Sequence, residues 1–461
     1  MESYFKRYLP EQDLFDRHLV KSEKYIDLYS ALAIALQTKK YNNNVESTCD
    51  ALFKQASLYK KFFQKYTHDW RPICKNEPAD SQTSALAVLL LYIWFKKNNN
   101  PYRRDLGKQL NALNTILTCI KHSKEIWLRA DSLLYKDILR DLDELTSASS
   151  TPPKINSKNY FSDYEKLSSI EPKTIPITIM YSEGPIGRAY LKTFELLRLR
   201  PEKIIHLVFS RDRSSGESIG RFLPKKIRSL YCYEIEDFRM NYWPRNIKKN
   251  HPHLFSAISS TIAGQLDFPI DFIENTTGKV DFESCANTVE SLLIENLHDD
   301  SLTSYLSQRC EGNILFTGGG IVPKKNFDLQ NIQLLHVHPG FLPDIRGADC
   351  SLWSSLVFGL PSASAFFMDP RIDMGEVVLS TWLPSLEVRL TENYSSDILY
   401  RSVFSFIDPW IRSFALRLLL LTIKNEQKLN FTKQEESSGT TFYFMSEKFR
   451  EIALKKYFAK I

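Results

Sequence analysis

The feature that most constrains the fold is a segment, residues 312–380, in which three short apolar runs each end at residues that turn the backbone. Apolar runs of this length, bounded by turn residues, predict buried strands. The runs are residues 313–317, 333–337 and 363–368, and they are followed by Gly318-Gly319-Gly320, Pro339-Gly340 and Asp369-Pro370. Parallel strands that end together place the loops that follow them along one edge of a sheet, where open α/β sheets bind ligands. The segment therefore predicts an α/β site at the carboxyl ends of three strands.

Two histidines and an aspartate in this segment are candidates for acid–base chemistry. His336 and His338 are two residues apart, so in an extended strand they point to the same face. Asp373 lies in an Asp-Met-Gly turn after the third run. In an isolated His-x-His pair, one histidine commonly serves chemistry while the other is a hydrogen-bonded core residue. The turns around this pair and the later aspartate favour a shared site, so we expect all three side chains to meet.

The order and spacing of these residues resemble the catalytic core of the folate-dependent formyltransferases, a family that includes the glycinamide ribonucleotide, methionyl-tRNA and amino-sugar formyltransferases. The family pattern is Asn-x-His-Pro-Ser-Leu-Leu-Pro, then Arg-Gly or Lys-Gly, then Asp-x-Gly. The matching residues here are His336-Val337-His338-Pro339-Gly340-Phe341-Leu342-Pro343, Arg346-Gly347-Ala348 and Asp373-Met374-Gly375. The resemblance covers residues 174–385 and is strongest in the last third of that range.

Two positions depart from the family pattern. His336 stands where the family has Asn, and Gly340 stands where it has Ser, whereas His338 and Asp373 match directly. The resemblance implies that the residue at 336 and His338 donate hydrogen bonds to the oxygen of the reacting formyl group. It also implies that Asp373 tunes His338 and helps to move protons. A ring N–H of His336 can take the place of the Asn donor, and because an imidazole titrates, we expect a different pH dependence.

The resemblance implies transfer of a formyl group from formyl-tetrahydrofolate, as co-substrate, to an amine of a small-molecule or nucleotide-linked acceptor. Attack of an amine on a formyl group needs a hydrogen-bond donor at the carbonyl oxygen and a proton acceptor nearby. In the family layout the folate lies along the strand ends. The residues expected to bind it are Gly319, Gly320, Ile321, Val322, Phe367 and Met368. A nucleic-acid acceptor fits the core but is less favoured.

Two other classes of enzyme fit the same residues. A hydrolase would use water in place of the amine and would release formate and tetrahydrofolate. A metal enzyme would use His336, His338 and Asp373 as a site of two histidines and one carboxylate. We expect no metal, because the family resemblance accounts for Asp373 without one.

Composition places the chain among ordinary soluble proteins. Its 461 residues are enough for two or three domains, and a net charge of +6 is too small for this length to indicate a nucleic-acid partner. Seven scattered cysteines without a CxxC pair are typical of a reducing cytoplasm and provide no zinc site. We find no signal segment and no apolar run of membrane-spanning length, so we expect a cytoplasmic protein with no membrane partner. The oligomeric state is open.

The sequence divides into a helical part, an α/β part and a second helical part. Residues 1–148 have apolar residues at spacings of three and four, which predicts an all-helical accessory domain. Small polar residues and a Pro pair follow, which predicts a linker over 149–173. We expect a Rossmann-like α/β core at 174–385, and a mainly helical extension at 386–461 that contains a long helix at 394–424 interrupted at Pro409.

The first half of the core reads as a β-α-β unit, with strands at 177–181 and 204–209 around a helix at 188–198. The turn before that helix could hold a substrate phosphate, and some of the basic residues in 211–249 could contact a nucleotide or diphosphate. A solvated surface is the alternative for the basic residues. We further expect a loop around His251 and His253, a strand at 269–272 and a helix at 282–297.

Overall fold

The computed structural model describes Tyr92 and Phe95 and residues 106–122, 133–147, 152–153, 171–213, 215–424, 429–435 and 438–460. By its internal contacts the chain divides into one unit of Met1–Ser149 with Tyr443–Phe449, and a second of Ser150–Phe442 with Arg450–Ile461. The expected helical domain at 1–148 and the linker at 149–173 lie largely outside the described residues. Within the first unit, α8 (Leu106–His122) and α10 (Leu133–Ser147) are helices.

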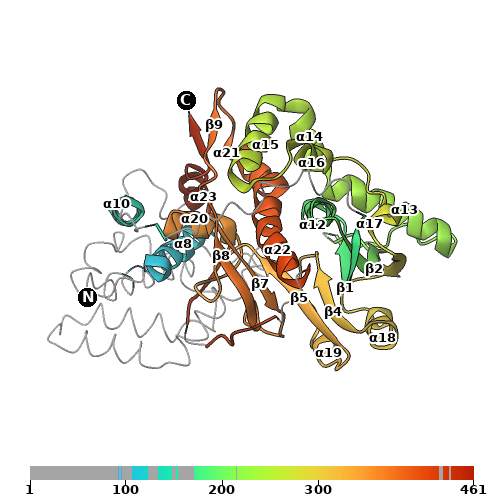
Figure 1. Ribbon diagram of the computed structural model, residues 1–461. Coiled ribbons are helices and arrows are strands. Elements are labelled where there is room, and N and C mark those ends of the chain that lie inside the picture. Colours follow the sequence, from blue (N-terminus) through green and yellow to red (C-terminus); the bar gives the residue numbers. More distant parts are fainter. Residues whose placement is uncertain are drawn as a thin grey trace. The chain divides into compact units, whose positions relative to one another are not determined.

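The second unit is built on one seven-stranded sheet of order β3-β2-β1-β4-β5-β7-β8 (Figure 1). Its strands are β1 (Lys173–Ser182), β2 (Leu199–Phe209), β3 (Thr288–Ile294), β4 (Gly312–Phe316), β5 (Ile332–His338), β7 (Ser362–Phe367) and β8 (Val377–Trp382). The strands from β3 to β5 pair in parallel, whereas β7 runs antiparallel to β5 and β8 antiparallel to β7. All three apolar runs are strands, but the third does not end at the same edge as the other two.

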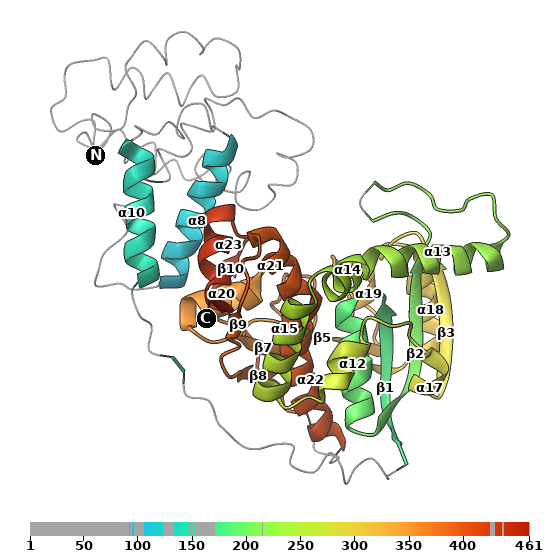
Figure 2. The same ribbon diagram turned by 90° about the horizontal axis from the view of Figure 1, so that it is seen from above.

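Helices cover both faces of this sheet, as Figures 1 and 2 show. One face carries α12 (Pro185–Leu196), α13 (Lys225–Met240), α17 (Phe282–Cys285) and α22 (Asp408–Lys424), and the other carries α18 (Asp300–Arg309) and α19 (Lys324–Phe327). The remaining helices are α14 (Tyr242–Asn250), α15 (Pro252–Leu266), α16 (Ile270–Asn275), α20 (Cys350–Phe358), α21 (Ser396–Ser402) and α23 (Glu447–Leu454). Two short parallel pairs complete the fold, namely β10 (Thr440–Phe442) with β6 (Ile345–Gly347) and β11 (Phe458–Lys460) with β9 (Val388–Leu390).

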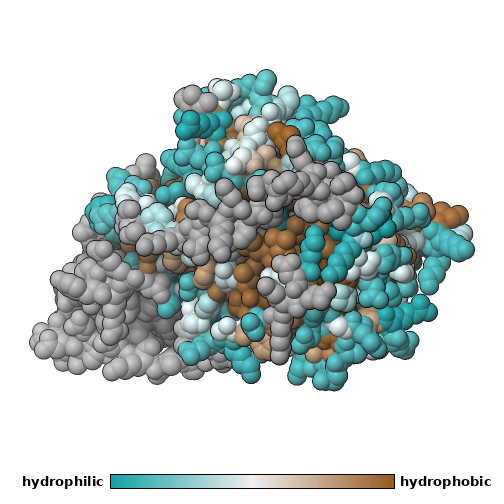
Figure 3. All heavy atoms as spheres, in the orientation of Figure 1, coloured by the Kyte–Doolittle hydropathy of each residue, from teal (hydrophilic) through white to brown (hydrophobic). Residues whose placement is uncertain are grey.

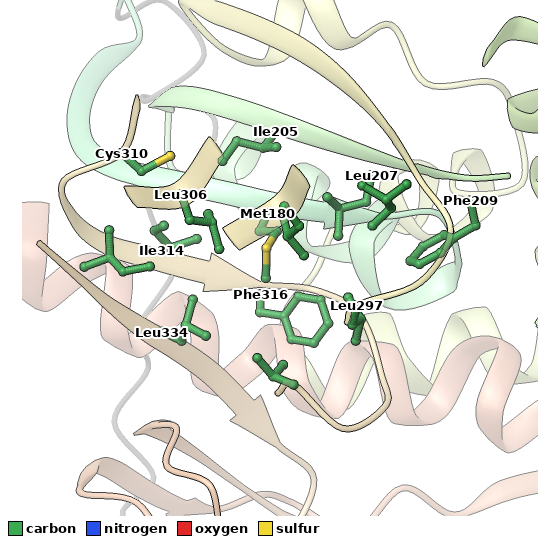
Figure 4. Close-up of a cluster of buried hydrophobic side chains, with 14 residues drawn as sticks. Met180, Ile205, Leu207, Phe209, Leu297, Leu306, Cys310, Ile314, Phe316 and Leu334 are labelled. Carbon is green, nitrogen blue, oxygen red and sulfur yellow. The ribbon is translucent and has the colours of Figure 1, made fainter. Parts of the chain in front are cut away.

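The core on the α18 face is a cluster of alternate residues from neighbouring strands (Figure 4). Met180 from β1, Ile205 from β2 and Ile314 from β4 pack there against Leu302 and Leu306 of α18, and all five are fully buried. Alternation along each strand sends these side chains to one face and their neighbours to the other. The carboxyl ends of β1, β4 and β5 are thereby fixed side by side at one edge.

Three expected elements of the core have a different structure. Residues 288–294 form the edge strand β3 rather than part of a helix, because pairing with β2 overrides the helical spacing of a short apolar run. Pro269 precedes the helix α16 rather than opening a strand, since its fixed φ suits a helix start. His251 stands at the N-cap position of α15, without a capping hydrogen bond from its side chain, so the second His-x-His lies at a helix start and not in a loop.

The long C-terminal helix belongs to the same layer as the core helices. α22 packs against α12, β7 and β5, so residues 408–424 form part of the helical cover of the sheet. The expected interruption at Pro409 is a π-helical turn, η1 (Val403–Ile407), between α21 and α22. Proline has no N–H to donate, so the regular hydrogen-bond pattern of the helix cannot continue through it, and the π turn lies just before it.

Candidate active site

His338 and Asp373 form the centre of the site. His338, the last residue of β5, is 3% exposed, and its Nε2 lies 3.0 Å from the carbonyl oxygen of Ile345. Because a carbonyl only accepts, Nε2 carries the hydrogen and donates it. The other ring nitrogen, Nδ1, lies 3.5 Å from Asp373 Oδ2, which accepts a 2.8 Å hydrogen bond from Gly347 N. Strand β6 therefore positions both side chains, His338 through Ile345 and Asp373 through Gly347.

This arrangement sets Nδ1 of His338 against the Asp373 carboxylate. With Nε2 donating to Ile345, a neutral ring presents the lone pair of Nδ1 to the carboxylate, and the contact is attractive only when a proton lies between them. Burial lowers the pKa of His338, and the Asp373 carboxylate acts against that shift. The pair can thus hold and release a proton without large movement of either side chain.

The loop that carries Asp373 connects β7 to β8 and folds back towards the end of β5. Asp373 has φ 52°, a left-handed conformation that a non-glycine residue adopts at a cost. Gln434 stabilises the loop, because its Nε2 donates to the carbonyl oxygens of Asp373 at 2.9 Å and of Gly375 at 2.7 Å. Gln434 lies far from the motif in the sequence, and no signal in its own surroundings points to this role.

His336 lies on the same face of β5 as His338, as expected, and both rings contact the ring of Phe366. Its Nδ1 is 3.0 Å from the carbonyl oxygen of Phe316, and its Nε2 is 3.3 Å from Nη1 of Arg412. The first contact needs a hydrogen on Nδ1, and the second needs a lone pair on Nε2. Both ring nitrogens of His336 are therefore engaged, so this structure offers no ring N–H in the place of the family's Asn donor.

Arg412 is a site residue that the sequence reasoning missed. It lies on α22, and its Nη1 also donates to the carbonyl oxygen of Val337 at 2.6 Å, while its Nε donates to Asp408 Oδ2 at 2.7 Å. Asp408 is 2% exposed, and its carboxylate balances the positive charge of the guanidinium. Burial first, and the Arg412 cation second, lower the pKa of His336 to about 4. An Asp and an Arg four residues apart within an apolar helix were the available sequence signal.

Gly340 explains one departure from the family pattern. A Cβ at this position would lie 2.6 Å from the carbonyl oxygen of Ile345 and 2.7 Å from Nε2 of His338. Both distances are too short for a carbon atom. The close contact of His338 with Ile345 therefore requires glycine here, and the serine of the family does not fit this arrangement.

The residues expected to bind folate divide into two groups. Gly319, Gly320 and Ile321 are exposed just after β4, at the carboxyl edge of the sheet, and Phe367 is half-buried at the end of β7. Val322, by contrast, is buried in the core cluster on the α18 face, and Met368 packs partly against that cluster. The structure thus directs the Val322 side chain into the core rather than towards a ligand.

The turn before α12 holds a carboxylate of the protein itself. Glu183 is 1% exposed, and its Oε1 accepts hydrogen bonds from Gly184 N at 2.8 Å and from Arg188 Nε at 2.7 Å. This carboxylate occupies the position at the helix start where we expected a substrate phosphate. Several of the basic residues in 211–249 are likewise paired within the protein, for example Arg245 with Asp237.

The metal hypothesis finds no geometric support. His336 and His338 each direct a ring N–H to a backbone carbonyl, and the remaining nitrogens face Arg412 and Asp373 respectively. A cation placed among the three expected ligands would meet the Arg412 guanidinium. Among the described residues no group of three His, Cys, Asp or Glu is arranged to hold a metal ion.

Comparison with known proteins gives structural likeness at low sequence identity. No family model matches the chain, and no curated protein matches it. A sugar N-formyltransferase from Shewanella is similar in structure at 10% identity, over 61% of this chain and 87% of that one, with a TM-score of 0.31. A 4-N formyltransferase from Francisella tularensis is similar at 11% identity, over 62% and 87%, with a TM-score of 0.28. A methionyl-tRNA formyltransferase from Clostridium thermocellum is similar at 18% identity, over 34% and 62%, with a TM-score of 0.23.

Proposed function

We propose that this chain transfers a formyl group from formyl-tetrahydrofolate to an amine of a small-molecule or nucleotide-linked acceptor. The observation that carries the proposal is the convergence of three parts of the motif. His338, Gly347 and Asp373 come from separate segments, and they meet as a buried imidazole, a backbone donor and a carboxylate. The motif resemblance and this geometry support the same reaction.

The proposed reaction forms one carbon–nitrogen bond and breaks another. The acceptor nitrogen attacks the formyl carbon and loses a proton, and the folate nitrogen leaves and gains one. The His338–Asp373 pair receives the first proton and delivers the second, which is general acid–base catalysis by one shared proton. Burial of His338 and the hydrogen bond from Gly347 N hold the pair in place, so proton transfer needs little reorganisation.

Formyl-tetrahydrofolate supplies the activated formyl group. We place it beside Gly319, Gly320 and Ile321, which are exposed at the carboxyl edge of the sheet. A Cβ at Gly319 would meet no atom within 4 Å, so the backbone at this position is open to an approaching ligand. Phe367, which pairs with Leu335 of β5, provides a half-buried aromatic side chain. Val322 and Met368 pack in or against the core cluster on the α18 face.

Arg412 and His336 act together as positioning residues in this proposal. The guanidinium donates to Val337 and to His336, and so fixes the end of strand β5, from which His338 projects. In this proposal its positive charge stabilises the negative charge that develops on the formyl oxygen. His336 thereby replaces the family Asn as part of a pair, not as a single donor.

The test is to incubate the purified full chain with formyl-tetrahydrofolate and a panel of amines that includes nucleotide-linked amino sugars, amino acids and aminoacyl-tRNA. Mass spectrometry measures formylated acceptor and formate, and absorbance measures released tetrahydrofolate. We expect one class of acceptor to be formylated in proportion to tetrahydrofolate released. Formate release at the same rate without any amine would identify a hydrolase. Binding of folate with neither product would refute both reactions for these substrates.

A further inference from the structure

Helix α13 has its polar and apolar faces inverted relative to a normal surface helix. Its buried residues are Cys232, Glu236 and Asp237, whereas Ile227 is 57% exposed and Leu230 is 65% exposed. The hydrophobic effect normally drives the apolar face of a surface helix against the core. An exposed apolar surface on a folded protein commonly marks a site that binds a partner or a membrane.

The exposed apolar side chains form one continuous surface. We define the α13 tip as Phe222, Leu223, Ile227, Leu230 and Tyr231, all of them exposed, with Phe222 at 86%. Ile227, Leu230 and Tyr231 have the spacing of one face of the helix, and Phe222 and Leu223 lie in the loop just before it. Figure 2 shows the start of α13 and this loop projecting from the sheet, and Figure 3 shows apolar side chains gathered at the corresponding margin of the molecule.

The charges around the α13 tip are of one sign. Arg221, Lys225 and Lys226 are exposed beside it, and the sequence has no Asp or Glu between Glu217 and Glu234. The guanidinium of Arg221 lies 4.6 Å from the ring centre of Phe222, so cation and apolar group project together. The next acidic residue along α13, Glu234, is paired with Lys279.

We propose that the α13 tip binds peripherally to a bilayer that contains anionic phospholipid. Apolar side chains on a projecting surface enter the boundary between headgroups and acyl chains, and flanking lysine and arginine residues contact the anionic headgroups. A second copy of this chain is a poorer match, because a two-fold contact through the same surface brings the three cations of each copy towards those of the other. The proposal is independent of the proposed reaction, and it revises the expectation of no membrane partner.

No helix in the described part of the chain is long and apolar enough to cross a membrane, so the binding is at the surface. It should be reversible and sensitive to salt, because electrostatic attraction to anionic lipids is screened by salt. Neutral vesicles should bind little protein.

The experiment is flotation of the full chain with vesicles of phosphatidylcholine alone, or of phosphatidylcholine mixed with phosphatidylglycerol, at low and high salt. We expect binding to the mixed vesicles only. The triple variant Phe222→Ala, Ile227→Ala, Leu230→Ala and the double variant Lys225→Glu, Lys226→Glu should each weaken it by roughly tenfold or more. Matched controls are Ile270→Ala, an exposed isoleucine on α16, and Lys249→Glu, an exposed lysine on α14, which should bind as the parent chain does.

Three results would overturn the proposal. One is that the unmodified chain, monomeric by sedimentation and with normal circular dichroism, does not float with anionic vesicles. Another is that the tip variants and the controls bind equally. The third is that the apolar triple variant dissolves a dimer, or abolishes binding to total tRNA, while vesicle binding is absent throughout, which would assign the tip to a second copy or to nucleic acid.

Discussion

At the scale of single residues, the role of each histidine in the site depends on which of its ring nitrogens carries the hydrogen. His338 gives its Nε2 hydrogen to Ile345 and turns Nδ1 to Asp373, whereas His336 gives its Nδ1 hydrogen to Phe316 and turns Nε2 to Arg412. Neighbouring histidines of one strand therefore differ in role, because one faces a carboxylate and the other a guanidinium. Burial lowers the pKa of both rings; the Asp373 carboxylate acts against that shift at His338, whereas the Arg412 guanidinium adds to it at His336.

Replacing Asp373 by Asn should keep the fold and remove most of the turnover. The Asn side-chain oxygen can still accept from Gly347 N, but an amide cannot share a proton with His338. A positioned general acid or base contributes ~10² to 10⁴ to the rate, and a loss of that size is expected. Tetrahydrofolate release under single-turnover conditions measures it, with folate binding as the control. Turnover within a few-fold of the parent enzyme would exclude Asp373 from the mechanism.

Removing the Arg412 charge should raise the pKa of His336. The double variant Arg412→Met, Asp408→Asn removes the cation together with its buried carboxylate, so no buried charge is left without a partner. The pKa of His336 should rise from about 4 towards its ordinary value, since burial then acts without the cation. An NMR titration of labelled histidine measures this shift. Because the matched pair has been removed, an unchanged pKa would show that Arg412 does not control His336.

Introducing the family's serine at Gly340 should be harmful in this chain. Its Cβ would meet the Ile345 carbonyl oxygen at 2.6 Å and Nε2 of His338 at 2.7 Å, so one of the two must move. Overpacking of this kind typically costs about 1–3 kcal/mol in the free energy of unfolding, and the displaced ring should lower turnover. Urea denaturation and initial rates measure the two effects. A Gly340→Ser enzyme with the parent's stability and rate would show that the loop adapts without cost.

At the scale of elements, the sequence predicts strands better than their direction or their partners. The runs at 313–317, 333–337 and 363–368 are the strands β4, β5 and β7, because apolar runs bounded by Gly, Pro and Asp are local signals. The reversal of β7 relative to β5 is a long-range pairing that no local pattern encodes. Arg412 reaches His336 across 76 residues of chain, so its role was visible only after α22 had been placed against β5.

A histidine of β2, buried where that strand packs against α13 and α17, should make the protein less stable in mild acid. His206 of β2 is 4% exposed, with its ring centre 4.6 Å from that of Phe282 and 5.0 Å from that of Tyr233. Burial lowers the pKa of His206 to about 4, whereas the unfolded chain has a value of about 6.5. Below pH 6.5 the imidazole of His206 therefore binds a proton in the unfolded state but not in the folded state. The free energy of unfolding falls as a result until about pH 4 is reached.

The size of the pKa shift limits the decrease in the free energy of unfolding that His206 can cause to about 3 kcal/mol. Urea unfolding of the parent and of His206→Phe between pH 7 and pH 4 measures it. The variant should lose less stability over this range than the parent, while His298→Gln, a change at an exposed histidine, should follow the parent curve. Identical slopes for all three proteins would mean that His206 is protonated in the folded state without penalty.

At the scale of the whole molecule, all the groups assigned to the site lie in one of the two units. His336, His338, Asp373 and Arg412 come from β5, the β7–β8 loop and α22, which belong to the second unit, Ser150–Phe442 with Arg450–Ile461. The first unit includes Tyr443–Phe449, where the Asn114 side chain holds the backbone at Phe444 and Ser446 through bonds of 3.1 and 2.7 Å. The chain thus leaves the second unit and returns to it just before its end.

A fragment of residues 150–461 should therefore bind folate with nearly the affinity of the full chain, yet be less stable. Every residue assigned to the folate and to the proton pair is retained, whereas segment 443–449 loses its hydrogen bonds to Asn114. Two lost hydrogen bonds correspond to roughly 1–3 kcal/mol in the free energy of unfolding. The matched control is Asn114→Ala in the full chain, which removes the same two bonds and keeps residues 1–149. The expected result is that the fragment is destabilised at least as much as this variant, with folate affinity unchanged in both by calorimetry. A folded fragment that no longer binds folate, beside an Asn114→Ala chain that does, would show that the first unit contributes directly to the donor site.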